Sequence, residues 1–342
     1  MKALTTDVIF ILSFNKFIPV KKNKIVIAAL LAVFSCMSFT PVKDIKTESK
    51  TSNVIPVKKY TQALNFFVIS DWGWSGLKDQ QVVADGMATQ ATQMEPQFIV
   101  SCGDNFQIAG VTSTSDPLWI SNFENVYTQK SLQVNWFPVL GNHDYKGNTQ
   151  AQIDYSKISQ RWKMEDHYYT FVRKINDSIS ARFIFLDTPP LVDEYHTKGG
   201  YPDIAAQDTA RQMHWLNDVL ANSKEQWKVV FGHHPVYSAS NKHGNTIEMI
   251  QKVKPLLEKY HAQFYFCGHD HDFQHLREKG KDVDYVVTGT GGEPRPSSTD
   301  ELSLFSNSAP GFSEVTFHAD SIRVIFMGAN GESLHTIERS YR

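Results

Sequence analysis

The sequence lacks the cysteine content, the charge excess and the repeats that mark several classes of protein. Three cysteines in 342 residues exclude a disulfide-stapled scaffold. The 34 Lys and Arg nearly balance the 36 Asp and Glu, so no strong field is available to attract nucleic acid or an anionic membrane. No internal repeat or low-complexity tract is present. An ordinary globular composition remains, with 41% hydrophobic residues and a length that suits one large α/β domain or two small ones.

The first 40 residues are predicted to be an export signal. Three lysines precede an apolar run, Ile25 to Phe34, which is too short to span a bilayer comfortably but suits the hydrophobic part of a signal peptide. We therefore expect a periplasmic or secreted protein. The stretch Val33 to Cys36 has a weak similarity to a bacterial lipoprotein cleavage site, so membrane anchoring through lipidation of Cys36 is the alternative to a soluble exported protein.

Residues 41–60 are rich in Lys, Thr, Ser and Pro, the composition of a solvated linker, so the folded domain is expected to span residues 61–342. Within it, short β-branched and aromatic runs predict buried strands, and stretches with helical spacing lie between several of them. This alternation predicts a layered α/β domain. The helical series are Met213, Leu216 and Leu220, and Ile247, Ile250, Val253 and Leu257. The predicted strands are Phe66–Ser70, Phe98–Cys102, Phe137–Leu140, Phe183–Leu186, Lys228–Phe231, Phe264–Cys267, Tyr285–Thr288 and Ile322–Met327.

Two of these apolar runs end in a cysteine. Cys102 and Cys267 each stand just before a glycine and a polar cluster. We expect both to be buried free thiols, because small apolar side chains of this kind are common on core strands.

Five predicted strands run directly into a polar cluster that contains glycine. Loops beyond the carboxyl ends of strands are where α/β sheets bind ligands. Carboxylate oxygen, amide oxygen and imidazole nitrogen together suit iron, zinc or manganese, and so much His does not suit calcium. One such cluster alone is more often a turn histidine or a helix cap, so the metal-site prediction depends on all five occurring in order. The clusters are Asp71-Trp72-Gly73, Gly103-Asp104-Asn105, Gly141-Asn142-His143-Asp144, Gly232-His233-His234-Pro235 and Gly268-His269-Asp270-His271.

With these clusters the sequence resembles the calcineurin-like metallophosphoesterases, and among them the small purple acid phosphatases typified by tartrate-resistant acid phosphatase. The resemblance covers about Gln62 to Thr336 and includes stretches outside the clusters, such as Phe185–Thr188, Gln212–Leu216 and Val287–Gly291. It implies an α/β fold in which a layered β-sandwich of two mixed sheets is flanked by helices. It also implies an acid phosphatase-like enzyme that hydrolyses phosphomonoesters by attack of a metal-bound hydroxide.

The resemblance further implies a ligand set for two metal ions, expected to be Fe with Zn, Mn or a second Fe. Carried over by position, Asp71 and His271 bind the first metal, Asn142, His233 and His269 bind the second, and Asp104 bridges both.

Three further residues are expected to act in the reaction or to support it. His143 and His243 match two active-site histidines of the family, the latter with one extra residue in its loop. Either can hydrogen-bond phosphate or protonate the leaving oxygen, because imidazole titrates near working pH. A plain surface-loop histidine is the alternative for His243. Asp144 either orients His143 or caps a turn. His234 stands where the family has Tyr and is expected to line the pocket without binding metal.

The resemblance breaks at Gln107, where the purple enzymes carry the Tyr whose phenolate binds iron(III) and produces their colour. A neutral amide is a much weaker donor to a trivalent ion. We therefore expect a first site that holds a divalent ion, or holds metal weakly, with the carbonyl oxygen of Gln107 as an optional ligand.

Three functions stay open. The first is a phosphomonoesterase, the second a phosphodiesterase or nucleotidase of the same superfamily, and the third a non-catalytic metal-binding protein with a degraded first metal site. The expected partner is a small phosphorylated substrate, with no nucleic acid, and the chain is expected to act as a monomer.

Overall fold

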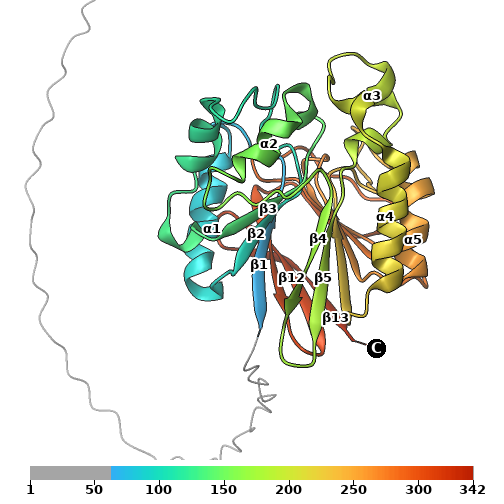
Figure 1. Ribbon diagram of the computed structural model, residues 1–342. Coiled ribbons are helices and arrows are strands. Elements are labelled where there is room, and N and C mark those ends of the chain that lie inside the picture. Colours follow the sequence, from blue (N-terminus) through green and yellow to red (C-terminus); the bar gives the residue numbers. More distant parts are fainter. Residues whose placement is uncertain (1–62, 342) are drawn as a thin grey trace, which may run out of the picture. The chain divides into compact units, whose positions relative to one another are not determined.

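The structure is a computed structural model that describes residues 63–341 and places their strands in two sheets (Figure 1). The predicted signal, residues 1–40, and the predicted linker, residues 41–60, lie outside the described residues and stay predictions. Among residues 63–341, no helix combines the length and the apolar character needed to cross a membrane.

The first sheet has six strands in the order β13-β12-β11-β1-β2-β3. Its strands β1, β2 and β3 run parallel, whereas β11, β12 and β13 pair antiparallel, so the sheet is mixed. The bounds are β1 Leu64–Ile69, β2 Phe98–Ser101, β3 Asn135–Pro138, β11 Gly311–Phe317, β12 Ser321–Gly328 and β13 Ser333–Ser340.

The second sheet has seven strands in the order β10-β8-β9-β7-β6-β5-β4. Strands β5, β6, β7 and β9 form its parallel centre, and antiparallel strands lie at both sides, so this sheet is also mixed. The bounds are β4 Tyr169–Lys174, β5 Ser180–Phe185, β6 Trp227–Phe231, β7 Phe264–Cys267, β8 Phe273–Leu276, β9 Asp284–Thr288 and β10 Ser303–Asn307.

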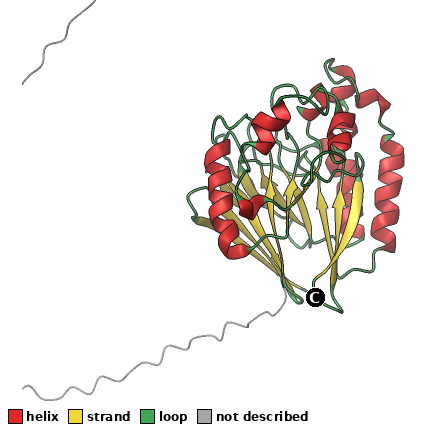
Figure 2. Cartoon of the chain, turned by 60° about the vertical axis from the view of Figure 1, so that its left-hand side comes forward, coloured by secondary structure: helices red, strands yellow, loops and turns green. Residues whose placement is uncertain are grey.

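Helices cover the outer faces of the two sheets, as Figures 1 and 2 show, with α1 beside the first sheet and α4 and α5 beside the second. The predicted fold, two mixed sheets flanked by helices, is thereby confirmed. The bounds are α1 Gln80–Met94, α2 Thr149–Tyr155, α3 Glu194–Thr197, α4 Thr209–Asn222 and α5 Lys254–Lys259.

Aromatic side chains fill the space between the sheets. Phe66 of β1 packs edge-to-face on Phe183 of β5 with ring centroids 5.5 Å apart, and Phe317 of β11 lies 5.8 Å from the same ring. All three side chains are fully buried, and each contributes on the order of 1.5–3 kcal/mol through removal from water. Strand β1 is buried almost throughout, as expected for a strand covered on both faces.

All eight predicted strands are present, and Cys102 and Cys267 are buried and free as expected. The five strands without a sequence signal are β4, β8, β10, β11 and β13. Three of these, β4, β10 and β13, are sheet edges that are largely half-buried or exposed, so they carry no continuous apolar run.

One of the two predicted helical faces is partly wrong. In α4, Leu216 and Leu220 are buried as predicted. In the second helical segment, before α5, Ile247 is instead 56% exposed. The chain from Met249 to Val253 forms a π-helical turn before α5, and its wider spacing shifts the face of the helix that meets the sheet. The buried residue at this point is Met249.

Candidate metal centre

The five polar clusters follow β1, β2, β3, β6 and β7, and the structure brings them together at one end of the two sheets, where loops gather in Figure 2. Parallel strands within each sheet deliver their carboxyl ends to the same edge. Three of the predicted ligands, Asp71, Asp104 and His269, have positive φ values of 60°, 48° and 69°. A strained left-handed backbone at non-glycine residues is typical of sites whose side chains are aimed by the surrounding fold.

Two of the histidines are held by backbone carbonyl groups. His233 Nδ1 lies 2.9 Å from the carbonyl oxygen of Cys102, and His271 Nδ1 lies 2.7 Å from that of Glu293. A carbonyl oxygen only accepts, so both rings carry their proton on Nδ1 and turn the lone pair of Nε2 inward. Outer hydrogen bonds of this kind fix the ring orientation of metal-binding histidines.

The inward-facing atoms are acceptors that face other acceptors. His233 Nε2 lies 3.1 Å from Asn142 Oδ1 and 3.5 Å from Asp104 Oδ1, and His271 Nε2 lies 3.4 Å from Asp71 Oδ1. Ligand bonds of about 2.1 Å place neighbouring ligand atoms roughly 3.0–3.4 Å apart around one ion. Among the described residues, Asp71 Oδ1 is buried and accepts no hydrogen bond. These atoms therefore fit metal ions in number, type and spacing.

His269 lies against two other predicted ligands, Asn142 and Asp71. Its Nδ1 lies 3.0 Å from Asn142 Oδ1, and its backbone N–H donates to Asp71 Oδ2 at 3.0 Å. Burial lowers the pKa of His269 well below its usual range, and burial together with the charge of Arg295 lowers the pKa of His271 to about 4. Both shifts favour the neutral imidazole, which is the form that binds metal.

The pKa values of Asp71 and Asp104 are shifted in opposite directions. Burial raises the pKa of Asp71 well above its ordinary value, and the negative charge of Asp104 adds to the rise. Burial also acts to raise the pKa of Asp104, but His233 and His143 outweigh it and the pKa is lowered. Two buried carboxylates this close need positive charge nearby, which metal ions would supply.

His143 lies beside the bridging position as a neutral hydrogen-bond donor. Its Nδ1 accepts from the backbone N–H of Ile108 at 3.1 Å and lies 3.2 Å from Lys146 Nζ. The proton therefore sits on Nε2, which is 4.0 Å from Asp104 Oδ2. Burial lowers the pKa of His143. Because the side chain is 28% exposed, its N–H can reach a ligand in the site.

Asp144 makes no hydrogen bond to the ring of His143 among the described residues, so of its two alternatives the contacts fit the cap of a turn. Its Oδ2 accepts from the backbone N–H groups of Gly141 and Asn105 and from Asn105 Nδ2. Its Oδ1 accepts from the N–H of Phe106 and from Gln152 Nε2. Burial raises the pKa of Asp144 to about 7, against these five donors. The carboxylate joins the loop of Asp104 to the loop of Asn142 and is a positioning group.

His243 is an exposed loop residue, as in the surface-loop alternative, and its ring lies beside the predicted ligand His269. Its ring centroid is 4.1 Å from that of His269. Both histidines line a pocket of about 390 Å³.

Both ring nitrogens of His234 have hydrogen-bond partners, and the residue lines the pocket, as predicted. Its Nδ1 lies 3.0 Å from Thr188 Oγ1 and its Nε2 lies 2.9 Å from Tyr195 Oη. No sequence pattern indicated Tyr195 or the carbonyl group of Glu293, because neither belongs to a strand-end cluster.

Gln107 reaches the bridging carboxylate. It is 5% exposed, and its Nε2 donates to Asp104 Oδ2 at 3.4 Å. The Gln107 side chain is therefore in contact with Asp104 through its amide nitrogen.

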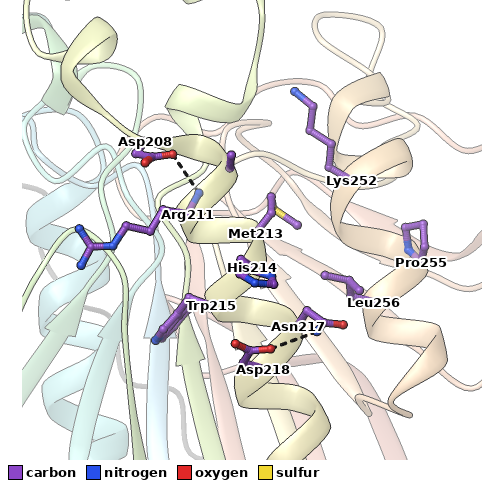
Figure 3. Close-up of a pocket in the computed structure, with 11 residues that line it drawn as sticks. Asp208, Arg211, Met213, His214, Trp215, Asn217, Asp218, Lys252, Pro255 and Leu256 are labelled. Atoms are coloured by element: carbon purple, nitrogen blue, oxygen red, sulfur yellow. Dashed lines mark hydrogen bonds between the residues drawn. The ribbon is translucent and has the colours of Figure 1, made fainter.

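A second depression lies beside α4 and α5. An open groove of about 990 Å³ runs between α4 and α5, lined by Met213, Trp215 and Leu256 among others (Figure 3). It shares no residue with the centre.

Comparison with known proteins agrees with this fold and site. Residues 64–273 match the calcineurin-like phosphoesterase family, and the chain belongs to that family. It is 32% identical to purple acid phosphatase 4 of Arabidopsis thaliana over 92% of this chain and 94% of the relative. It is 34% identical to tartrate-resistant acid phosphatase type 5 of Oryctolagus cuniculus over 83% of this chain and 93% of the relative. The predicted relationship to the acid phosphatases is thereby confirmed.

Solved structures show the same fold. The chain is similar to GAP50, the anchor in the inner membrane complex of Plasmodium, with a TM-score of 0.73 and 26% identity, covering 82% of this chain and 90% of that one. It is also similar in fold to the purple acid phosphatase PPD1 from yellow lupin seeds, with a TM-score of 0.59 and 13% identity, covering 81% of this chain and 54% of that one.

Proposed function

We propose that this chain is a dinuclear-metal phosphatase that hydrolyses phosphomonoesters. The observation that carries the proposal is the convergence of unprotonated ring nitrogens, an amide oxygen and two buried carboxylates at ligand-to-ligand spacing. Asp71 and His271 would hold the first ion, Asn142, His233 and His269 the second, with Asp104 between them. Two divalent ions in such a site supply Lewis-acid chemistry and acidify water.

The chain's own side chains would orient the substrate and donate hydrogen bonds or a proton to it. His143 Nε2–H lies 4.0 Å from Asp104 Oδ2 and can donate to a phosphate oxygen or to the leaving oxygen. His243 lies against the ring of His269, with centroids 4.1 Å apart. Both residues are proposed to contact substrate, whereas Asp144 acts only through the loops that it joins.

Hydrolysis of monoesters is favoured because curated relatives at 32–34% identity are acid phosphatases. The rival is a phosphodiesterase or nucleotidase of the same family, since metal geometry does not choose between ester classes. A nitrophenyl phosphate monoester and the matching diester separate the two. A kcat/KM higher for the diester would overturn the monoesterase proposal.

Metal dependence is tested with two ligand variants and a distant control. Asp104→Ala and His233→Ala are expected to lose bound metal and to lower kcat/KM by at least a hundredfold. His214→Ala, an exposed residue of α4 in the groove of Figure 3, should retain both. Full activity in both ligand variants would refute the enzyme proposal.

A non-catalytic role is the second candidate, because the similar structure GAP50 is described as an anchor. Gln107 is the residue of the centre that supports it. A protein that retains two metals yet hydrolyses neither monoester nor diester would establish this alternative.

We further propose that the first site holds a divalent ion and that the protein is colourless. The amide of Gln107 gives no phenolate to bind iron(III). Elemental analysis and the visible spectrum of the purified protein test this, with Gln107→Tyr loaded with iron as the positive control. A strong phenolate-to-iron absorption in the unaltered protein would contradict the proposal.

We propose export because of the basic and apolar segment before residue 40. We also propose that the chain acts as a monomer and that its partner is a small phosphorylated substrate. Cell fractionation and metabolic labelling with a fatty acid distinguish a soluble exported protein from one anchored through Cys36. Light scattering of the purified protein gives its oligomeric state.

A further inference from the structure

Beside the metal centre, a chain of hydrogen bonds joins three buried side chains that are not expected metal ligands. Thr188 Oγ1 lies 3.0 Å from His234 Nδ1, and His234 Nε2 lies 2.9 Å from Tyr195 Oη. Thr188 and His234 are at most 1% exposed and Tyr195 is 5% exposed. Thr188 follows β5, His234 follows β6 and Tyr195 lies in α3, so only the folded chain brings them together.

The direction of each hydrogen bond follows from Thr188. Its Oγ1 accepts from the backbone N–H of His233 at 3.1 Å and from that of His234 at 3.0 Å. With both lone pairs in use, the Thr188 hydroxyl hydrogen must go to His234 Nδ1. His234 therefore carries its own proton on Nε2 and donates it to Tyr195 Oη. The hydroxyl hydrogen of Tyr195 is left over for another acceptor.

That hydrogen becomes available at the wall of the substrate pocket. Tyr195 lines the pocket of about 390 Å³ together with His269 and His243. The rings form a continuous series: Tyr195 is 5.4 Å from His234, His234 is 4.5 Å from His269, and His269 is 4.1 Å from His243. Burial raises the pKa of Tyr195 above its usual range, so the phenol stays protonated and remains a donor.

The main alternative is that His234 binds metal. One ring nitrogen of His234 and those of His233 and His269 lie within 4.8 Å of one another. However, both nitrogens of His234 already have hydrogen-bond partners, whereas His233 turns a lone pair toward Asn142 and Asp104. The hydrogen-bond pattern thus separates His234 from the ligands.

We propose that Tyr195 donates a hydrogen bond to a phosphate oxygen of the bound ester and that His234 is the positioning residue that holds it there. This inference deepens the proposed phosphatase function and rests on it for the substrate class. A phosphate group is recognised because its oxygens accept hydrogen bonds, and a neutral phenol adds no charge that would repel it.

The test is binding of inorganic phosphate to the metal-loaded full-length chain by calorimetry, with Tyr195→Phe as the decisive variant. Loss of one hydrogen bond to a charged oxygen is expected to raise the Kd of phosphate about tenfold, with metal content unchanged. KM for a monoester should rise more than kcat falls. Tyr168→Phe, whose ring packs on Trp215 at 4.8 Å outside the pocket, is the matched control and should bind as the unaltered protein does.

His234 is tested by two substitutions. His234→Phe should raise the Kd of phosphate by a similar factor with both metals retained, and His234→Gln, which keeps a donor for Tyr195, should recover part of the affinity. Loss of metal in both variants would make His234 a ligand and overturn the inference. So would an unchanged Kd in Tyr195→Phe, or an absence of phosphate binding by the metal-loaded unaltered chain. A chain that binds phosphate through Tyr195 but hydrolyses no ester would refute only the proposed enzymatic function.

Discussion

Replacement of Asp144 by Asn separates a positioning role from a catalytic one. The substitution preserves shape but converts one acceptor oxygen to an NH₂ group. In its least costly orientation the new amide keeps the three donors at Oδ2 and faces two donors at Oδ1, the N–H of Phe106 and Gln152 Nε2. Each buried donor left unpaired costs about 1–3 kcal/mol, so we expect the free energy of unfolding to fall by about 2–6 kcal/mol.

Urea unfolding of the metal-free protein, followed by tryptophan fluorescence, measures this loss. Metal content after dialysis should also fall, because Asp144 joins the loops of Asp104 and Asn142. Asp154→Asn is the control, since that exposed carboxylate of α2 pairs with Lys157 at the surface. An Asp144→Asn protein with unaltered stability and metal content but no activity would refute the positioning role.

Three further predictions concern the packing and charge of the domain. Gly268→Ala should lose first-site metal without global unfolding, as read by metal analysis and circular dichroism, because the new Cβ would lie 1.9 Å from Ser70 Oγ and 2.3 Å from Asp71 Oδ2. Burial acts to raise the pKa of Glu225, but hydrogen bonds led by that from Arg182 bring it to about 2. This stabilisation is present above the unfolded pKa of about 4.3 and is lost as pH falls toward 2. Arg182→Gln should therefore lower the free energy of unfolding by about 1–3 kcal/mol at pH 7 and by little near pH 2. Urea titration at several pH values measures this difference. Metal chelation should lower the melting temperature, because free metal at a thousandfold excess over Kd adds about 4 kcal/mol. An unchanged melting temperature would mean that metal does not bind the folded state preferentially.

The fold class and most residues of the candidate metal centre could be predicted from the sequence. Strands buried on both faces need continuous apolar runs, so β1, β2 and β7 are visible as such runs. The chain must turn directly after each, and His, Asp and Asn beside glycine at these turns mark the ligand set. Edge strands such as β13 face solvent on one side and form by pairing, so their sequence carries little signal.

The roles of Asp144, Tyr195 and His234 depended on tertiary structure. Asp144 differs from a catalytic carboxylate only in its hydrogen-bond donors, and these come from the loops after β2 and β3 and from α2. The proton positions on His233, His271 and His234 are likewise set by carbonyl and hydroxyl groups distant in the chain. The sequence by itself determined which atoms can bind metal, because that is a property of residue type. Which lone pairs face inward, and which side chains only support them, was decided by long-range hydrogen bonds that form when the two sheets pack together.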